Sequence, residues 1–239
     1  MTTRTKIYFA AIAWFGLSFG LLGCGQGASA PPASIDVQET ASAAGNPRAP
    51  VAAEIPEPTS IYAQAPATME DPLVVVHTTE GDITIELALD QAPQTVNNFL
   101  TNYVQSGFYE GVIFHHVESG ALIAAGGYAE DLSLKPTGAP IPNEANNRLP
   151  NVRGSVAMAR DADAAHSATS QFFINLADNG GLDYKGNQSD ADRGYCVFGK
   201  VVDGLDVVDR IAAQKVTKTP DFDHLPARTV KIKSVEQIR

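Results

Sequence analysis

The stretch SATSQFFINLAD, residues 167–178, carries the most informative pattern of this 239-residue chain. Polar residues enclose a short run of aromatic and β-branched residues, which is typical of a buried β-strand. Because neighbouring strand residues point to opposite faces, Phe172 and Phe173 are expected to face opposite ways. One of the two then belongs to a core, and the other is available to a surface.

Several other runs of the same kind follow one another along the chain, separated by Gly, Asn and Asp. They are VIFHHV (112–117), GALIAA (120–125), GSVAMA (154–159) and YCVFGKVV (195–202). Before them, LVVVHTTEGDITIELAL (73–89) places the polar residues TEGD between two Val- and Ile-rich runs, which predicts a hairpin. Near the C-terminus, TVKIKSVEQI (229–238) predicts a closing strand.

Two segments have helical spacing instead. In residues 92–107, apolar side chains recur every three or four positions, with Pro93 before the helix and Gly107 after it. Residues 205–214, LDVVDRIAAQ, predict a second short helix. Many strands with two helices favour an antiparallel barrel or sandwich.

The composition narrows the class of protein. A hydrophobic share of 44% is that of a globular chain, and the formal net charge is -10. Binding to nucleic-acid phosphates needs clustered Lys and Arg, which are scattered here, so we expect no nucleic-acid partner.

The N-terminus has the pattern of an export signal, residues 1–23. Arg4 and Lys6 precede an apolar run that ends shortly before Cys24. A permanent membrane span is the alternative, but the run is short for a hydrocarbon core about 30 Å thick. The ending LLGC (21–24) resembles the bacterial lipobox, which implies that Cys24 is lipidated and held at the periplasmic face of a membrane. Gly25, next in the chain, favours the outer membrane.

Residues 24–71 comprise Cys24, which is expected to be lipidated, and a tether rich in Ala, Pro and Ser. This composition cannot bury enough apolar surface to offset its ordering entropy, so we expect a disordered linker before a domain at residues 72–239. If Cys24 is acylated, Cys196 has no partner within the chain, and a buried, inert thiol is expected there.

The order of the segments resembles a cyclophilin from about Leu73 to the C-terminus. FYEGVIFHHV (108–117) is similar to the family's YDGxxFHRV, and RGSVAMAR (153–160) followed by SATSQFFINLAD is similar to its GxxxMA and SQFFI motifs. YCVFGKVVDGLDVVDRI (195–211) is similar to VFGKVxxGxxVV. The resemblance, strongest to periplasmic bacterial members, implies a mainly β fold: a closed eight-stranded antiparallel β-barrel capped by two α-helices. The implied activity is cis–trans isomerisation of X–Pro bonds (rotamase activity), with no cofactor.

This reaction makes and breaks no bond. Its barrier of about 18–20 kcal/mol arises because amide resonance is lost as the C–N bond twists. Two features lower this barrier: an apolar slot that holds the proline ring, and a strong hydrogen-bond donor aimed at the prolyl nitrogen. The resemblance implies that the arginine of FHR is that donor, a role suited to a rigid guanidinium that is always charged.

Several positions depart from the family pattern. His116 stands at the arginine, Ala121 at the phenylalanine of the proline slot, and Ala124 at a glutamine that binds substrate backbone; Gly181 replaces an aromatic residue. The substrate-binding positions implied by the resemblance are Ala121, Leu122, Ala124, Ala159, Gln171, Phe173, Leu182 and Tyr195.

The adjacent histidines His115 and His116 allow several interpretations. Since strand neighbours point to opposite faces, and no Asp, Glu or His at ligand spacing joins these two, we expect no metal site. His115 matches a histidine of the family motif and is interpreted as a structural core residue. His116 has two interpretations. It is either a surrogate donor, weak because an imidazole is mostly neutral near pH 7, or a surface residue of a site that is no longer used.

Two functions remain open. The first is a lipid-anchored periplasmic isomerase that assists folding of unfolded, proline-containing exported proteins with weakened activity. The second is a non-catalytic peptide-binding or scaffold lipoprotein on the same barrel, whose surface around Ala121, Ala124 and Gly181 contacts a dedicated partner.

Overall fold

The structure, a computed structural model, describes residues 70–239. The predictions of an export signal and a lipidated Cys24, and all but the last two residues of the tether, lie outside the described residues. Within residues 70–239, the helices are too short or too polar to cross a membrane.

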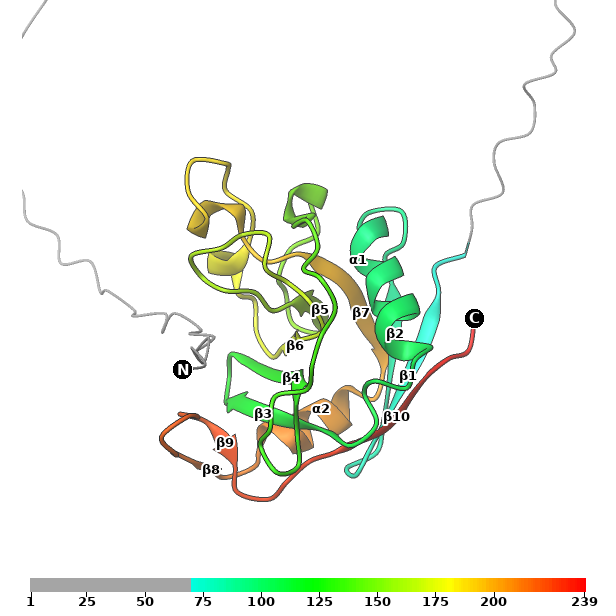
Figure 1. Cartoon of the computed structure of the whole chain (residues 1–239), viewed down its shortest axis with the longest axis vertical. Helices are drawn as coiled ribbons and strands as arrows, with labels where there is room; N and C mark the ends of the chain where they lie inside the picture. Colours follow the sequence, from blue (N-terminus) through cyan, green and yellow to red (C-terminus); the bar gives the residue numbers. More distant parts are fainter. Residues whose placement is uncertain (1–69) are drawn as a thin grey trace, which may run out of the picture. The chain divides into compact units, whose positions relative to one another are not determined.

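Eight strands form one antiparallel sheet in the order β10-β1-β2-β7-β5-β6-β4-β3. Their bounds are β1 (Leu73–Thr78), β2 (Asp82–Leu87), β3 (Val112–Glu118), β4 (Leu122–Ala129), β5 (Ser155–Met158), β6 (Phe172–Asn175), β7 (Val197–Asp203) and β10 (Ile232–Gln237). β3 and the segment that leads into β10 lie side by side: Phe114 N–H donates to Val230 O at 2.9 Å. The sheet therefore nearly closes, which confirms the predicted barrel (Figure 1).

The first hairpin forms where the sequence predicts it. In β1 and β2 the buried residues alternate with more exposed ones, as the Val/Ile pattern requires. The turn between the strands is closed by Thr78 N–H, which donates to Gly81 O at 2.9 Å.

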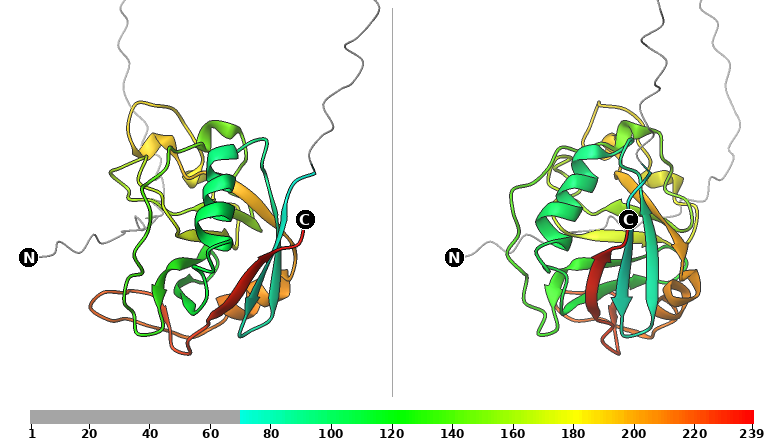
Figure 2. Two further views of the ribbon diagram at one scale, coloured as in Figure 1. Left: turned by 45° about the vertical axis from the view of Figure 1, so that its right-hand side comes forward. Right: turned by 90° about the vertical axis from the view of Figure 1, so that its right-hand side faces the viewer.

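Both predicted helices are present, and they lie at opposite ends of the barrel (Figure 2). The first comprises α1 (Pro93–Asn97) and continues as a π-helix, η1 (Asn98–Val104). Its free N-terminal amides receive a cap from a distant residue: the Glu144 carboxylate accepts bonds from Gln94 N–H and Thr95 N–H. The second helix is α2 (Leu205–Ala212), which buries three apolar residues, Val207, Val208 and Ile211.

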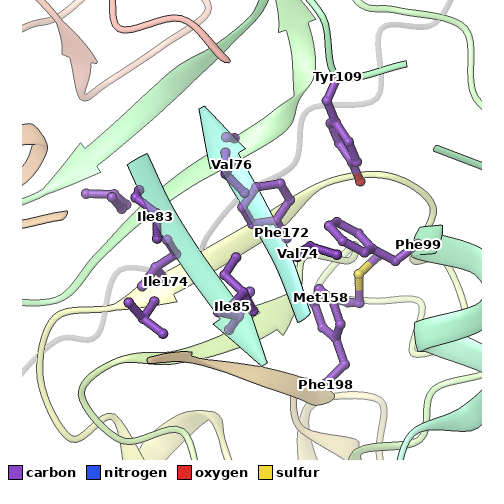
Figure 3. Close-up of a cluster of buried hydrophobic side chains, with 14 of the residues drawn as sticks. Val74, Val76, Ile83, Ile85, Phe99, Tyr109, Met158, Phe172, Ile174 and Phe198 are labelled. Carbon is purple, nitrogen blue, oxygen red and sulfur yellow. The ribbon is translucent and has the colours of Figure 1, made fainter. Parts of the chain in front are cut away.

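The barrel interior is filled by large apolar side chains from nearly every strand (Figure 3). Phe172 lies at its centre, with its ring centroid 6.0 Å from that of Phe99 and 5.7 Å from that of Tyr109. Phe173 belongs to a separate apolar cluster. The expectation that Phe172 and Phe173 face opposite ways is thus confirmed.

The C-terminal part contains elements that the sequence did not predict. Strands β8 (Val216–Thr217) and β9 (Leu225–Pro226) pair with each other. The segment ahead of β9 lies against β3, because Val117 N–H donates to His224 O at 2.9 Å. Three short 3-10 turns complete the described chain: η2 (Ala145–Asn147), η3 (Gly180–Leu182) and η4 (Ala191–Arg193).

Candidate functional site

Strand pairing places the predicted site residues in one row on the outer face of the sheet. His116 on β3 pairs with Ala124 on β4, Ala124 pairs with Phe173 on β6, and Phe173 pairs with Ala157 on β5. Directly paired residues of an antiparallel sheet share a face. With strands about 4.8 Å apart, His116 and Phe173 lie roughly 10 Å from each other along this row.

An apolar cluster covers most of this face, and it is separate from the barrel interior. Its buried members are Leu122, Ala124, Ala157, Ala159, Phe173 and Val197, with Leu149, Leu182 and Tyr195 packed against them. The rings of Phe173 and Tyr195 meet edge to face, with centroids 5.7 Å apart. Phe173 is 0% exposed. A proline ring can therefore reach Phe173 only after neighbouring side chains move.

Gln171 borders the cluster where the chain enters β6. It is buried, at 7% exposure, and its side chain lies over Gly127. A Cβ at Gly127 would come within 2.6 Å of Gln171 Cδ, so the absence of a side chain there makes room for the glutamine. The family resemblance implies that this amide binds a peptide backbone, whereas Ala124, at the position of the family's other glutamine, offers no polar group.

The loop that carries Leu182 is fixed to the barrel by buried amides. Asp183 Oδ1 accepts bonds from the Asn151 backbone N–H at 2.7 Å and from its side-chain amide at 3.0 Å. Asn175 donates to Asn151 Oδ1 at 3.2 Å. The position of Leu182 is therefore set by these hydrogen bonds as well as by its own packing.

Tyr195 is held by a residue that the sequence analysis did not single out. The Arg160 guanidinium lies over the Tyr195 ring, 4.5 Å from its centroid, and donates to Gly194 O at 2.9 Å and Asp190 O at 2.7 Å. Arg160 is only 3% exposed, and it donates further bonds to the carbonyls of Asp161 and Ala162, so backbone carbonyls accept four bonds from its guanidinium. It positions the tyrosine and cannot replace the missing cationic donor. Burial raises the pKa of the Tyr195 phenol.

Two further positions line the edge of the face. Gly181 is exposed, and a Cβ there would meet no atom within 4 Å, so the place of the family's aromatic residue is open. Ala121 is half-buried; its carbonyl accepts bonds from Leu176 N–H and the Asn179 amide, so its backbone is fixed although its side chain is short.

His116 lies at the opposite end of the row, next to two other ligand-type side chains. Its Nε2 is 3.8 Å from Glu118 Oε2, and its ring centroid is 4.9 Å from that of His224. Burial, and then the neighbouring His224, lower the pKa of His116 below its ordinary value of 6.5, against an opposing effect of Glu118. The ring is neutral near pH 7 and can donate one uncharged N–H.

His115 is a buried residue, as predicted, at 4% exposure. Its ring packs against Tyr128 and Phe222, with centroids 4.8 Å and 6.1 Å away. Burial is the main reason that its pKa falls to about 3. The pairing of β3 with β4 shifts between Phe114 and His116, so simple alternation, on which the prediction for the two histidines depended, does not hold at this bulge.

Cys196 is buried as predicted, and its Sγ lies 3.6 Å from Thr95 Oγ1. Burial raises the pKa of the thiol to about 12, so the reactive thiolate is not populated near neutral pH.

Comparison with known proteins agrees with this geometry. Residues 73–237 match the family described as cyclophilin type peptidyl-prolyl cis-trans isomerase/CLD. Peptidyl-prolyl cis-trans isomerase B of Escherichia coli is 48% identical over 163 residues, which are 68% of this chain and 98% of that protein. Peptidyl-prolyl cis-trans isomerase A of Dickeya dadantii is 44% identical, over 70% of this chain and 84% of that protein.

Among solved structures, a cyclophilin type peptidyl-prolyl cis-trans isomerase of Cryptosporidium parvum superposes with a TM-score of 0.56 and 25% identity. The match covers 71% of this chain and 98% of that one. The same protein was also solved in the presence of the dipeptide Ala-Pro, with a TM-score of 0.56. The chain belongs to the cyclophilin-type peptidyl-prolyl cis-trans isomerases, a family of enzymes that bind proline-containing peptides.

The structure brings together most of the residues that the sequence indicated. Leu122, Ala124, Phe173, Ala159, Leu182 and Tyr195 share the outer cluster, Gln171 borders it, and His116 lies in the same row. Arg160, Glu118 and His224 were missed. Glu118, two positions after His116 on one strand, could have been found from strand alternation. No local pattern links His224, 108 positions further on, to His116.

Proposed function

We propose that this cyclophilin is a slow isomerase that acts on proline-containing segments of unfolded exported proteins. The observation that carries the proposal is the row on the outer face. Phe173, Gln171 and Tyr195 are in place at one end, and a neutral His116 stands at the other. The apolar part of the slot remains, while the charged donor does not.

The reduced rate follows from the strength of the lost bond. A hydrogen bond to a charged group is worth about 1.5–3 kcal/mol. Losing one preorganised donor typically lowers a rate by about 10²–10³. A neutral imidazole supplies one shorter, weaker donor, and Ala121 and Ala124 remove further contacts to the substrate.

An isomerisation assay on a short Ala-Pro peptide tests this proposal. The full chain is expected to accelerate cis–trans exchange above the uncatalysed rate, by about 10²–10³ less than an intact cyclophilin. Phe173→Ala should abolish the remaining acceleration, whereas the control Tyr184→Ala, an exposed aromatic residue in the loop that carries Leu182, should keep it. Turnover equal to that of an intact relative would contradict the proposal.

A non-catalytic binding protein is the second candidate, and the full burial of Phe173 favours it. Here the wild-type chain binds Ala-Pro peptides or a dedicated partner without turnover. The triple variant His116→Arg, Ala121→Phe and Ala124→Gln separates the two functions. If exchange is catalysed only by the triple variant, the binding function is supported; if the wild type already catalyses it, that function is rejected.

We also propose that a lipid anchor holds the protein at the periplasmic side of a bacterial membrane. The outer membrane is favoured over the inner one. The basis is the export-type N-terminus and the LLGC sequence before Gly25. Mass spectrometry of the N-terminal peptide is expected to show acyl chains on Cys24, and Cys24→Ala should release the protein from the membrane fraction. An unmodified Cys24 in membrane-bound protein would contradict the anchor.

A further inference from the structure

His116, Glu118 and His224 form a compact group at the edge of the peptide-binding face. Each offers one nitrogen or oxygen atom, and these atoms all lie within 4.8 Å of one another. His116 and Glu118 are two positions apart on β3, and their side chains meet, with Nε2 and Oε2 3.8 Å apart. His224 reaches them from the segment before β9.

The backbone holds this arrangement in place. The bond from Val117 N–H to His224 O, 2.9 Å long, ties the residue between His116 and Glu118 to the third member of the group. All three side chains are half-buried, so their surroundings restrict their positions.

The residue types select a class of ion. Two imidazoles and one carboxylate, with a fourth position open, are the ligands of open Zn²⁺ sites. Calcium and magnesium prefer oxygen ligands throughout, so nitrogen donors disfavour them. Zn²⁺–ligand bonds of about 2.1 Å in a tetrahedron separate ligand atoms by about 3.4 Å. The distance from His116 Nε2 to Glu118 Oε2, 3.8 Å, is close to this value.

A further observation points to a ligand at this place. His224 Nδ1 is buried and makes no hydrogen bond within the described part of the chain, which is costly for a polar atom unless something binds it. The nearby Asp223 carboxylate interacts electrostatically with both histidines, but it is paired with Lys218 Nζ at 2.6 Å and adds little net charge to the group.

We propose that His116, Glu118 and His224 bind a divalent transition-metal ion of the Zn²⁺ type, with water in the fourth position. The ion would bridge β3 and the segment before β9. It would also bring positive charge to the end of the row where the family resemblance implies an arginine.

Calorimetric titration with ZnCl₂ alone tests the site directly. The full chain, purified without a histidine tag and treated with a chelator, is expected to bind one ion at pH 7.5 with a micromolar or tighter Kd. His224→Ala and Glu118→Gln should each weaken binding at least tenfold, and MgCl₂ should give no heat of specific binding. Because no peptide is present, failure here leaves the proposed isomerase function untouched.

His77→Ala is the matched control. His77 Nδ1 lies 2.9 Å from Asp82 Oδ1, so this residue is also a histidine paired with a carboxylate, but the three-residue group does not include it. Its replacement should leave Zn²⁺ affinity unchanged. Substitution of Co²⁺ should produce visible absorption typical of four-coordinate cobalt in the wild type and in His77→Ala only. Zn²⁺ binding that is absent, or equal in the wild type and His224→Ala, would overturn the proposal.

Discussion

The two faces of β3 and β4 are restricted in different ways, and the departures from the family pattern described above lie on the outer one. Their inward residues Phe114, Val117 and Ile123 are at most 1% exposed and belong to the barrel core. Their outward residues His116 and Ala124 occupy positions where the resemblance implies an arginine and a glutamine. Packing restricts the inner face to apolar side chains of suitable size, while the outer face is restricted only by the chemistry it performs. The barrel can therefore persist while the site changes.

The outer face itself has two unlike halves. The half formed by β6 and the segment before β7 retains Phe173 and Tyr195 in edge-to-face contact. The half formed by β3 and β4 presents a neutral imidazole and small side chains. An apolar half can bind a proline ring, but the other half has to supply the donor that lowers the twisting barrier. Binding and turnover are thus expected to respond to different substitutions.

The largest effect on stability is expected inside the barrel. Phe172→Ala should lower the free energy of unfolding by about 3–5 kcal/mol, because it leaves a cavity beside Phe99 and Tyr109. Chemical denaturation of the full chain measures the loss. The outward control His116→Ala should cost less than about 1 kcal/mol. Equal losses for both variants would break the distinction between the faces.

His115 gives the next effect, which depends on pH. The pKa of His115 is about 3 in the folded chain, whereas its ordinary value of 6.5 applies to the unfolded chain. As the pH falls, the unfolded state is therefore protonated before the folded state. Stability from this residue is present above about pH 6.5 and is lost as the pH falls towards 3. Between pH 7 and 5 the loss is about 2 kcal/mol.

The measurement compares the wild type with His115→Gln, a neutral replacement, by denaturation at both pH values. The wild type is expected to lose about 2 kcal/mol more than the variant over this interval. Parallel losses in the two proteins would show that His115 is protonated equally in its folded and unfolded states.

The sequence predicted the strands, both helices and the opposite orientations of Phe172 and Phe173, because these follow from periodicities of two and 3.6 residues. It did not predict the bulge at Phe114–His116, since an extra strand residue leaves no mark in a hydrophobic pattern. Nor did it place His224 beside His116. That contact depends on how an irregular segment packs over β3, and such tertiary contacts have no local signal.

The loop that ends at Tyr195 allows a sharper test of how the apolar half is positioned. Gly194 has φ 62° and ψ -166°, a region that is nearly restricted to glycine. A Cβ there would approach Asp183 C and Tyr184 N within 2.6 Å. Gly194→Ala should therefore cost about 1–3 kcal/mol in unfolding experiments and weaken peptide binding.

The matched control for that substitution is Gly181→Ala in the same loop, where a Cβ meets no atom within 4 Å. Its effect on stability should stay within about 0.5 kcal/mol. If Gly194→Ala were equally mild, Tyr195 would not depend on the conformation of this loop.

The smallest effect on stability is expected for Gly181→Trp, which is also the most selective test of the two halves. The open space at Gly181 accepts the ring, so the free energy of unfolding should change by less than about 0.5 kcal/mol. An aromatic ring beside Leu182 adds apolar contact worth about 0.5–1.5 kcal/mol, which should tighten Ala-Pro peptide binding by about two- to tenfold. The exchange rate of bound peptide should remain unchanged, because the new ring supplies no donor. A rise in that rate would mean that the apolar half, and not the charge missing at His116, limits turnover.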